Sequence, residues 1–305
     1  MRLECQVDSG GSEDPLQFVS QPRSQMPAGH SFAIQGETVH FTQEQIDFFH
    51  ANGYLLGPRV LSDATIAELK QRIQGILDGS VSFPKLYKGE TVERSDAKGQ
   101  LPSVKVVNLS RHDSVFRKVL GNEAVSTLAN ELMEGPVRLW EDQMIYKPAF
   151  DQKTTLGWHQ DYTYWDHVYP ADLATCWIAI DDATVDNGCM YVVPGSHRWD
   201  LDYSREDVDV TDPEWLLKRS DLPDQVEPVA CEVPAGHCHF HHCRTFHGSY
   251  GNKTDNPRRS YVMHLMPGHI RRGGEDWNDR MASVEGVAVG EIVQGPSYPE
   301  LPVVA

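Results

Sequence analysis

Beyond residue 136 the sequence breaks into short runs of β-branched and aromatic residues, and glycine, proline or asparagine separates each run from the next. Examples are "VRLWEDQMIYK", "LATCWIAI", "GCMYVVP" and "RRSYVMHLM". Such runs are typical of β-strands, and many short strands punctuated by turn residues favour a sandwich or barrel. The pattern therefore predicts a mainly β core over residues 136–267.

The sequence before this core carries helix signals. Thr42, followed three residues later by Gln45, has the pattern of a capping box ahead of "QEQIDFFHA". A second helix is predicted from about Ser62, where apolar residues follow helical spacing, and a third over "NEAVSTLANELM". We expect one domain over residues 39–305, with a helical part at 39–135, the β core at 136–267 and a C-terminal tail at 268–305. Residues 1–38 have no periodicity and are predicted to be an irregular extension.

Two long stretches, residues 79–104 and 198–228, fit neither a helix nor a strand pattern. Long irregular segments in a compact domain are usually functional or disordered. Trp199 and Trp215 give the second stretch aromatic anchors, so we interpret these stretches as lids. A solvated surface insertion is an equally simple interpretation.

Charge and composition exclude several classes of partner. The net charge of −17 argues against a nucleic-acid partner or an anionic membrane surface. No run of eighteen apolar residues predicts a membrane span, and the first fifteen residues lack the apolar core of a secretory signal. The six cysteines form no CxxC pair and are expected to be thiols in a reducing compartment. We therefore expect a cytoplasmic protein with no obligate protein partner.

Residues 236–249, "GHCHFHHCRTFHGS", contain five histidines. Histidine is a common metal ligand, but the spacing matches no zinc template. On a strand, His237, His239 and His241 point to the face opposite His242. Most of the cluster is therefore expected to be structural or to orient other side chains.

A second stretch, "GWHQDYTYW" at residues 157–165, contains His159 and Asp161 at a spacing that shares one face of a strand. An imidazole from elsewhere would complete a 2-His-1-carboxylate set, which binds Fe(II) and leaves coordination positions open. His247 is the candidate. Arg258 lies eleven residues further on and is suited to the far carboxylate of 2-oxoglutarate, because its planar fork binds carboxylates bidentately. Ser249 shares the strand face of His247 and is expected to donate to the same carboxylate.

These blocks together resemble the phytanoyl-CoA dioxygenase family of Fe(II)/2-oxoglutarate oxygenases. The resemblance rests on "FTQEQIDFFHANGYLL", "HQD", "DNGCMYVVPGSH" and "HGSYGNKTDNPRRS", and it covers roughly residues 39–267. It implies a double-stranded β-helix, which is a cupin-like jelly-roll, with helices packed on one sheet. It also implies Fe(II), 2-oxoglutarate and O2 as cofactor and cosubstrates. The residues implied as iron ligands are His159, Asp161 and His247, and those implied around the cosubstrate are Arg258, Ser249, Gln143, Trp177 and Lys105.

The resemblance implies hydroxylation of an unactivated C–H bond of a small-molecule metabolite, with release of succinate and CO2. Asp161 occupies the position that halogenating relatives leave to chloride, so hydroxylation is favoured over halogenation. Desaturation, epoxidation and ring closure start from the same centre and stay open. Tyr162, Tyr164 and Trp165 follow the HxD motif and are expected to line the substrate pocket.

Two other classes are compatible with part of the pattern. A non-catalytic cupin-like binding module would not need all four of His159, Asp161, His247 and Arg258. A zinc hydrolase could use the same three ligands but would have no use for Arg258 at this spacing. The alternative for Arg258 itself is a surface salt bridge, and its neighbour Arg259 is predicted to face the opposite side of the strand.

Overall fold

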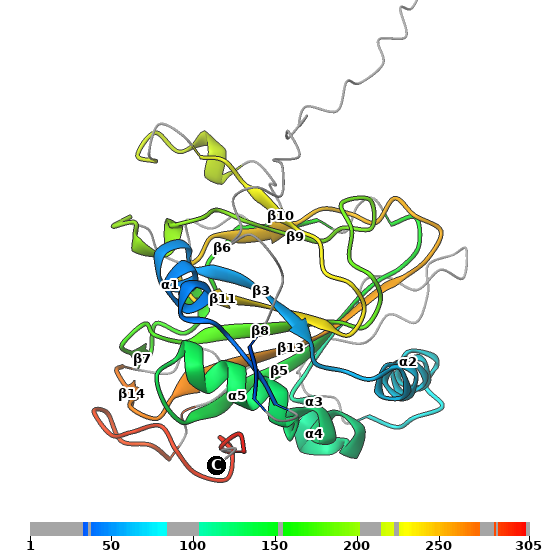
Figure 1. The fold of residues 1–305 in the computed structure, drawn as a ribbon, viewed down its shortest axis with the longest axis horizontal. Coiled ribbons are helices and arrows are strands. Elements are labelled where there is room, and N and C mark those ends of the chain that lie inside the picture. The colour runs from blue at the N-terminus through cyan, green and yellow to red at the C-terminus, as the bar shows by residue number, and fades with distance from the viewer. Residues whose placement is uncertain are drawn as a thin grey trace, which may run out of the picture.

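The computed structural model describes residues 33–35, 38–83, 104–151, 155–201, 215–222, 226–274, 284 and 286–302. Two antiparallel sheets face each other across its centre (Figure 1). The larger sheet has the order β3-β11-β8-β13-β5-β4 and the smaller has β10-β9-β12-β6. Two short pairs, β1 with β2 and β7 with β14, lie outside them.

The larger sheet consists of β3 (Tyr54–Arg59), β4 (Val104–Val107), β5 (Val137–Lys147), β8 (Ala174–Ala179), β11 (His237–His242) and β13 (Arg258–Pro267). The smaller sheet consists of β6 (Leu156–His159), β9 (Met190–Val192), β10 (Val229–Cys231) and β12 (His247–Ser249). The short pairs are β1 (Ala33–Gln35) with β2 (Thr38–His40) and β7 (Val168–Tyr169) with β14 (Arg271–Arg272). The helices are α1 (Gln43–Asn52), α2 (Asp63–Asp78), α3 (Leu109–His112), α4 (Ser114–Leu120) and α5 (Glu123–Leu132), with 3-10 turns η2 (Asp161–Tyr164), η3 (Ser196–Arg198) and η5 (Leu216–Lys218).

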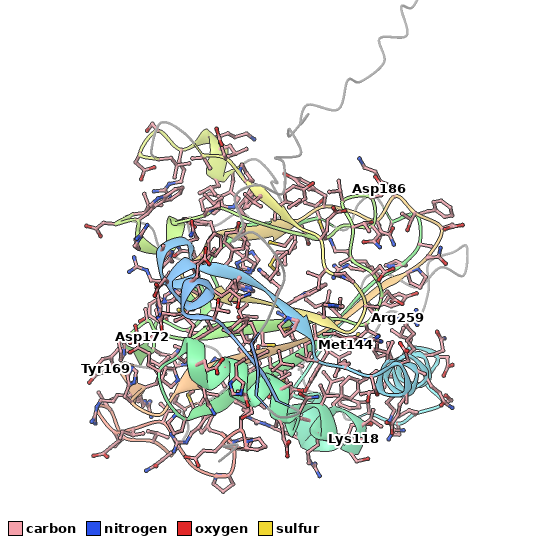
Figure 2. The ribbon with its side chains drawn as sticks, viewed as in Figure 1. Lys118, Met144, Tyr169, Asp172, Asp186 and Arg259 are labelled. Atoms are coloured by element: carbon pink, nitrogen blue, oxygen red, sulfur yellow. The ribbon has the colours of Figure 1, made fainter. Side chains whose placement is uncertain are left out.

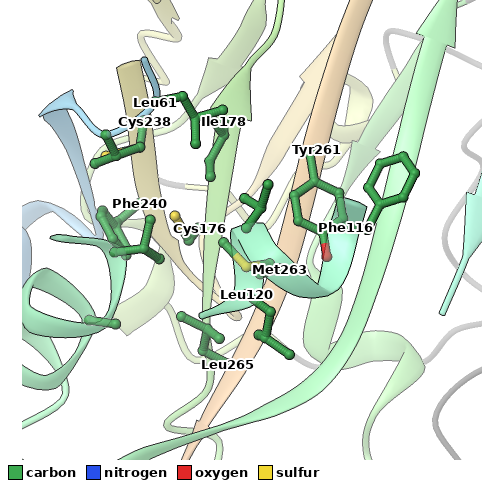
Figure 3. Packing of buried hydrophobic residues seen from close by; sticks show 14 of the residues in the cluster. Leu61, Phe116, Leu120, Cys176, Ile178, Cys238, Phe240, Tyr261, Met263 and Leu265 are labelled. Carbon is green, nitrogen blue, oxygen red and sulfur yellow. The ribbon is translucent and has the colours of Figure 1, made fainter. Parts of the chain in front are cut away.

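Alternation along the central strands builds the two layers of the core. On β13, Tyr261, Met263 and Leu265 point toward the helices and join an apolar cluster that also contains side chains of α1, α2, α4 and α5 (Figure 3). Residues of opposite parity, such as Val262 and Arg258, point toward the smaller sheet. The predicted jelly-roll with helices packed on one sheet is therefore confirmed, and the space between the sheets holds a second apolar cluster together with polar side chains.

The predicted helix starts are also found. Thr42 accepts a hydrogen bond from the backbone N–H of Gln45, and the Gln45 side chain accepts one from the Thr42 N–H, which completes the capping box of α1. Ser62 caps α2 with its side chain alone, which accepts a hydrogen bond from the N–H of Thr65. No helix among the described residues is long and apolar enough to cross a bilayer.

The region predicted as helical, residues 39–135, also contains two strands that were not predicted. The segments "YLLGPR" and "VKVV" form β3 and β4, which pair with β11 and β5 at the two edges of the larger sheet. Both segments are too short for their periodicity to separate strand from helix, so pairing with a distant partner decides their structure. Residues 33–35, predicted as irregular, form β1, while most of the N-terminal extension lies outside the described residues.

The two predicted lids lie largely outside the described residues, which omit 84–103, 202–214 and 223–225. The aromatic anchor of the second stretch is described. Trp215 is buried, and its indole N–H donates to the backbone oxygen of Trp158, one residue before His159. In the C-terminal tail, Tyr298 stacks on Trp140 of β5 with ring centroids 5.7 Å apart, so this part of the tail packs onto the larger sheet.

Candidate metal centre

Three predicted ligands meet between the sheets. His159 ends β6, His247 begins β12, and these two strands pair so that the two histidines are cross-strand partners. Asp161 arrives by a different route from the one predicted. The strand ends at His159 and the chain turns into η2, so the 3-10 turn rather than strand alternation brings the Asp161 carboxylate back to the two imidazoles.

The ligand atoms of His159, Asp161 and His247 lie within 4.8 Å of one another, and all three residues are buried. Asp161 Oδ1 is 3.9 Å from His159 Nε2 and 3.5 Å from His247 Nε2. Ligands about 2.1 Å from a metal and at right angles are ~3 Å apart, so this triangle is slightly wider than a closed coordination face. A small inward movement of the side chains would close it around an ion.

Backbone carbonyl groups fix the orientation of both imidazoles. Nδ1 of His159 is 2.9 Å from the oxygen of Gly157, and Nδ1 of His247 is 2.9 Å from the oxygen of Thr245. A carbonyl oxygen only accepts, so each Nδ1 carries the proton and each Nε2 presents its lone pair to the centre. Burial lowers the pKa of His159 and holds that of His247 well below its usual range, which keeps both rings neutral.

The Asp161 carboxylate is held on its other oxygen. Oδ2 accepts hydrogen bonds from Thr175 Oγ1 at 2.7 Å and from His241 Nε2 at 3.1 Å, which leaves Oδ1 facing the imidazoles. Burial acts to raise the pKa of Asp161, but the hydrogen bond that His241 donates outweighs it and helps to hold that pKa well below its usual range. The carboxylate is therefore ionised and oriented, as a metal ligand requires.

A chain of directed hydrogen bonds supports Thr175 in turn. Because the single hydroxyl proton of Thr175 goes to Asp161, its oxygen accepts from His264 Nδ1 at 2.8 Å. His264 Nε2 then accepts from the Gln143 amide at 2.5 Å. Gln143, predicted to contact the cosubstrate, thus also lies at the start of a relay that ends on Asp161. Among the described residues, its amide oxygen has no hydrogen-bond partner.

The donor set suits Fe(II). Two neutral imidazoles and one ionised carboxylate are the ligands of non-haem Fe(II) sites that keep positions open for other molecules. The carboxylate has its second oxygen occupied by protein donors, so it offers a single ligand atom. The residues present therefore fit the metal that the sequence pattern predicts.

A cavity of about 360 Å³ extends from these ligands between the two sheets. Lys105 and Leu156 lie along it with exposed side chains, whereas Arg258 and Lys147 line it with only 2% of their surface exposed. The cavity thus runs from an open side near β4 and β6 to an enclosed end where two basic side chains lie. Its apolar walls include Ile145, Met190, Trp177 and Val262.

The enclosed end contains both predicted and unpredicted residues. Arg258 Nη1 donates to Ser260 Oγ at 3.3 Å, and its guanidinium carbon lies 5.4 Å from the centre of the Trp177 ring. No carboxylate among the described residues forms an ion pair with Arg258, and its Nε has no partner there. Ser249 also lines this end, where its hydroxyl oxygen accepts from Lys147 Nζ at 2.9 Å.

Sequence reasoning missed Lys147, Thr175 and His264. All three line the cavity and project from paired strands of the larger sheet. Alternation from Gln143 two residues at a time along β5 points to Lys147, and that is the one sequence signal that could have found it. For Thr175 and His264 the deciding fact is cross-strand register, which the sequence does not reveal.

Two of the three residues predicted to line the substrate pocket do line the cavity. Tyr164 and Trp165 line the cavity, and the Trp165 ring meets the His264 ring edge-on at 4.7 Å. Tyr162 does not line the cavity: it packs in the same apolar cluster as Trp165 and donates its hydroxyl to the backbone oxygen of Val168. Lys105, predicted near the cosubstrate, lines the cavity from β4 with an exposed side chain.

The histidine-rich strand behaves as alternation predicts. His239 and His241 stack on the inner face with ring centroids 5.2 Å apart, while His242 contacts His197 on the other face. His241 is the member that bonds to Asp161. Arg259 likewise faces away from Arg258 and pairs with Asp181.

Comparison with known proteins gives this geometry a context. The family model for phytanoyl-CoA dioxygenase matches residues 49–260. A phytanoyl-CoA dioxygenase of Arabidopsis thaliana is 26% identical over 263 residues, which cover 76% of this chain and 90% of that protein. An ectoine dioxygenase of Stutzerimonas stutzeri is 24% identical over 239 residues, covering 73% and 76%.

Solved structures share the fold. The epimerase SnoN, in complex with Fe3+, alpha ketoglutarate and nogalamycin RO, superposes with a TM-score of 0.67 at 23% identity, covering 85% of this chain and 98% of that chain. EctD from S. alaskensis, with 2-oxoglutarate and 5-hydroxyectoine, gives 0.66 at 21% identity, covering 84% and 89%. The chain belongs to the phytanoyl-CoA dioxygenase family and is an Fe(II)- and 2-oxoglutarate-dependent dioxygenase.

Proposed function

We propose that this dioxygenase hydroxylates an unactivated C–H bond of a small-molecule metabolite. One 2-oxoglutarate and one O2 are consumed, one oxygen atom enters succinate, and the other becomes the product hydroxyl, with CO2 as the third product. The observation that carries the proposal is the convergence of His159, Asp161 and His247 on a cavity whose enclosed end presents Arg258.

His159, Asp161 and His247 would hold the Fe(II), which supplies the oxidising chemistry with O2 once it is bound. The residues around them keep this ligand set ready. The carbonyl oxygens of Gly157 and Thr245 select the imidazole tautomers, and Thr175 with His241 holds the carboxylate. A carboxylate at Asp161, rather than a small residue, fills the third protein position and supports hydroxylation over halogenation.

Arg258 and Ser249 would hold the far carboxylate of 2-oxoglutarate, with the 2-oxo acid end directed at the metal. Arg258 is buried, charged and without a carboxylate partner among the described residues, so a dicarboxylate would supply a missing counter-charge. Trp177 covers one face of the guanidinium and would exclude water from the contact. Gln143 would act mainly through His264, since its amide N–H is bonded there.

The substrate would enter from the open side of the cavity, past Lys105, Leu156 and Tyr164. Apolar walls limit the access of water, which supports chemistry on an unactivated C–H bond. The size of the cavity, about 360 Å³ in total, supports a small-molecule substrate beside the cosubstrate. We propose that the protein acts on this small molecule without a nucleic-acid, membrane or obligate protein partner.

The test is an anaerobic titration of the metal-free protein with Fe(II) and then 2-oxoglutarate, followed by visible absorption. A weak charge-transfer band that needs both additions is expected, and His247→Ala should abolish it. His242→Ala is the matched control from the same histidine-rich segment, residues 236–249, and should retain the band, because His242 faces away from the cavity. If the wild-type protein gives no band, the proposed cofactor site is wrong.

The outcome of the reaction is read from product mass. Hydroxylation adds one oxygen atom, desaturation and ring closure remove two hydrogen atoms, and epimerisation leaves the mass unchanged. Epimerisation is included because the structural neighbour SnoN is an epimerase. A product without added oxygen would replace hydroxylation as the proposal while leaving the metal site intact.

We also propose a cytoplasmic location. Five cysteines, Cys176, Cys189, Cys231, Cys238 and Cys243, are free thiols in buried positions, which supports a reducing compartment. Cell fractionation with immunodetection of the chain checks this, and recovery from a membrane or secreted fraction would contradict it.

A further inference from the structure

Lys147 is the last residue of β5 and lies directly across from Arg258 of β13. Both side chains are 98% removed from solvent, and both line the enclosed end of the cavity. The Lys147 amine donates to the Ser249 hydroxyl oxygen at 2.9 Å and to the backbone oxygen of Tyr250. It therefore joins the larger sheet to β12 at the end of the cavity that Arg258 and Ser249 also line.

The local backbone makes room for this amine. Gly188 has a φ of +82°, and a Cβ at that position would lie 3.3 Å from Lys147 Nζ. A glycine is thus required by its conformation and also leaves the amine unobstructed from that side. Ser249 Oγ accepts a hydrogen bond from Lys147, so its own hydroxyl proton points away from Lys147. Because Ser249 lines the cavity, that proton is available to a group bound there.

Two neighbouring basic groups in one enclosed pocket repel each other. Burial, and then the charge of Arg258, lowers the pKa of Lys147 to about 6, while Asp151 acts in the opposite direction. Burial lowers the pKa of Arg258 to about 10, so Arg258 stays charged near neutral pH. Burial raises the pKa of the Cys189 thiol to about 12, which leaves that group neutral. Without an anion, the pocket therefore holds one positive charge and a neutral amine.

We propose that Lys147 is a second cosubstrate-binding group, which takes up a proton from solvent when the far carboxylate of 2-oxoglutarate binds beside Arg258. The proposal rests on the proposed function. The balance is simple: the neutral amine, one proton and the dianion give an ammonium group beside the carboxylate, with no bond made or broken in the cosubstrate. The ammonium charge offsets the carboxylate, and Lys147 keeps the Ser249 hydroxyl turned toward it.

The experiment measures proton uptake rather than turnover. Fe(II)-loaded protein is titrated anaerobically with 2-oxoglutarate in a calorimeter, near neutral pH, in two buffers of different ionisation enthalpy. The difference in heat gives the protons taken up, and about one per 2-oxoglutarate is expected. The Kd should also rise with pH, by up to about tenfold per pH unit.

Three variants make the test specific. Lys147→Met should take up no proton and should weaken 2-oxoglutarate binding by about 10- to 100-fold. Lys147→Arg cannot lose its charge near neutral pH, so it should bind 2-oxoglutarate without proton uptake, and it serves also if the methionine variant folds poorly. Lys118→Met is the matched control on α4 (Figure 2): Lys118 forms an exposed ion pair with Glu68, neither residue lines the cavity, and the variant should behave as wild type.

Pyruvate separates the two ends of the pocket, since it has the 2-oxo acid group but no far carboxylate. It should bind without proton uptake, and Lys147→Met should leave its Kd unchanged. Binding of 2-oxoglutarate by wild type without proton uptake, or unchanged uptake and Kd in Lys147→Met, would overturn the role of Lys147. Failure of wild type to bind 2-oxoglutarate at all would instead overturn the proposed function and this inference with it.

Discussion

Replacing Thr175 with valine should weaken iron binding without changing the shape of the site. The hydroxyl of this fully buried residue donates to Asp161 and accepts from His264. Valine has the same outline but offers neither bond, so the carboxylate loses a donor and the His264 Nδ1–H loses its acceptor. The pKa of Asp161 should rise as a result, because a hydrogen bond to the charged form has been removed.

The magnitude follows from the bonds lost. A hydrogen bond to a charged group contributes about 1.5–3 kcal/mol, and a buried donor left without an acceptor costs about 1–3 kcal/mol. These terms are not additive, so we expect a loss of about 2–4 kcal/mol in the free energy of unfolding of the metal-free protein. Loss of a residue that orients a ligand typically lowers metal affinity about 10- to 100-fold, or about 1.4–2.7 kcal/mol.

The assay combines denaturant unfolding of the metal-free protein with anaerobic Fe(II) titration. Thr127→Val is the matched control, because Thr127 on α5 is also buried but, among the described residues, its hydroxyl has no hydrogen-bond partner. That variant should keep wild-type iron affinity and lose no stability. If Thr175→Val binds Fe(II) within about twofold of wild type while unfolding normally, the Asp161 carboxylate does not depend on Thr175 and the relay has no role in metal binding.

Three further outcomes follow from the same contacts. Arg258→Ala should raise the KM for 2-oxoglutarate about 100-fold or more at saturating substrate, whereas the control Arg259→Ala should not; an unchanged KM would refute the assignment of Arg258. The pKa of Lys147 is lowered in the folded state to about 6, from an ordinary value of about 10.4, so the unfolded chain holds that proton more tightly. The free energy of unfolding of the anion-free protein should therefore rise with pH between those two pKa values, by up to about 1.4 kcal/mol per pH unit. It should fall as the pH drops toward 6. Denaturation measured across this pH range should show no such slope for Lys147→Met. Trp215→Phe removes the indole N–H that donates to the oxygen of Trp158. It should lower the free energy of unfolding by about 1–2 kcal/mol, measured by heat or denaturant, and leave Fe(II) affinity unchanged. Weaker iron binding would show that this contact also positions His159.

The parts of the site that local sequence determines could be predicted. The capping residues Thr42 and Ser62 mark helix starts because a cap involves only the next few residues. Strand alternation separated Arg258 from Arg259 for the same reason, since the facing of neighbours on one strand is a local property. His159, Asp161, His247 and Arg258 were found together through motif spacing and the family resemblance.

Residues whose roles depend on pairing between distant segments could not be predicted. Thr175 reaches Asp161, and His264 reaches Thr175, because β8 and β13 pair in one particular register. A shift of one residue would turn both side chains toward the helices. The same limit explains the edge strands β3 and β4, whose short apolar sequences become strands only when β11 and β5 supply partners.

Asp161 was predicted for a reason that the structure corrects. The HxD spacing suggested two residues on one strand face, yet β6 ends at His159 and Asp161 opens a 3-10 turn. The turn is held by the N–H of Tyr162, which donates to the oxygen of Cys243. The motif therefore names two residues that lie together at the candidate site, while the contact that positions the second of them comes from another strand end.

The two predicted imidazole ligands and the basic residues belong to different sheets. His159 and His247 come from the smaller sheet, whereas Arg258 and Lys147 come from the larger one. A dicarboxylate that reaches from the metal to Arg258 would therefore be a cross-link between two walls that otherwise meet mainly through side chains. Its occupancy should slow amide hydrogen exchange in β6, β12 and the end of β5 together, so that the two halves of the sandwich open as one cooperative unit rather than separately.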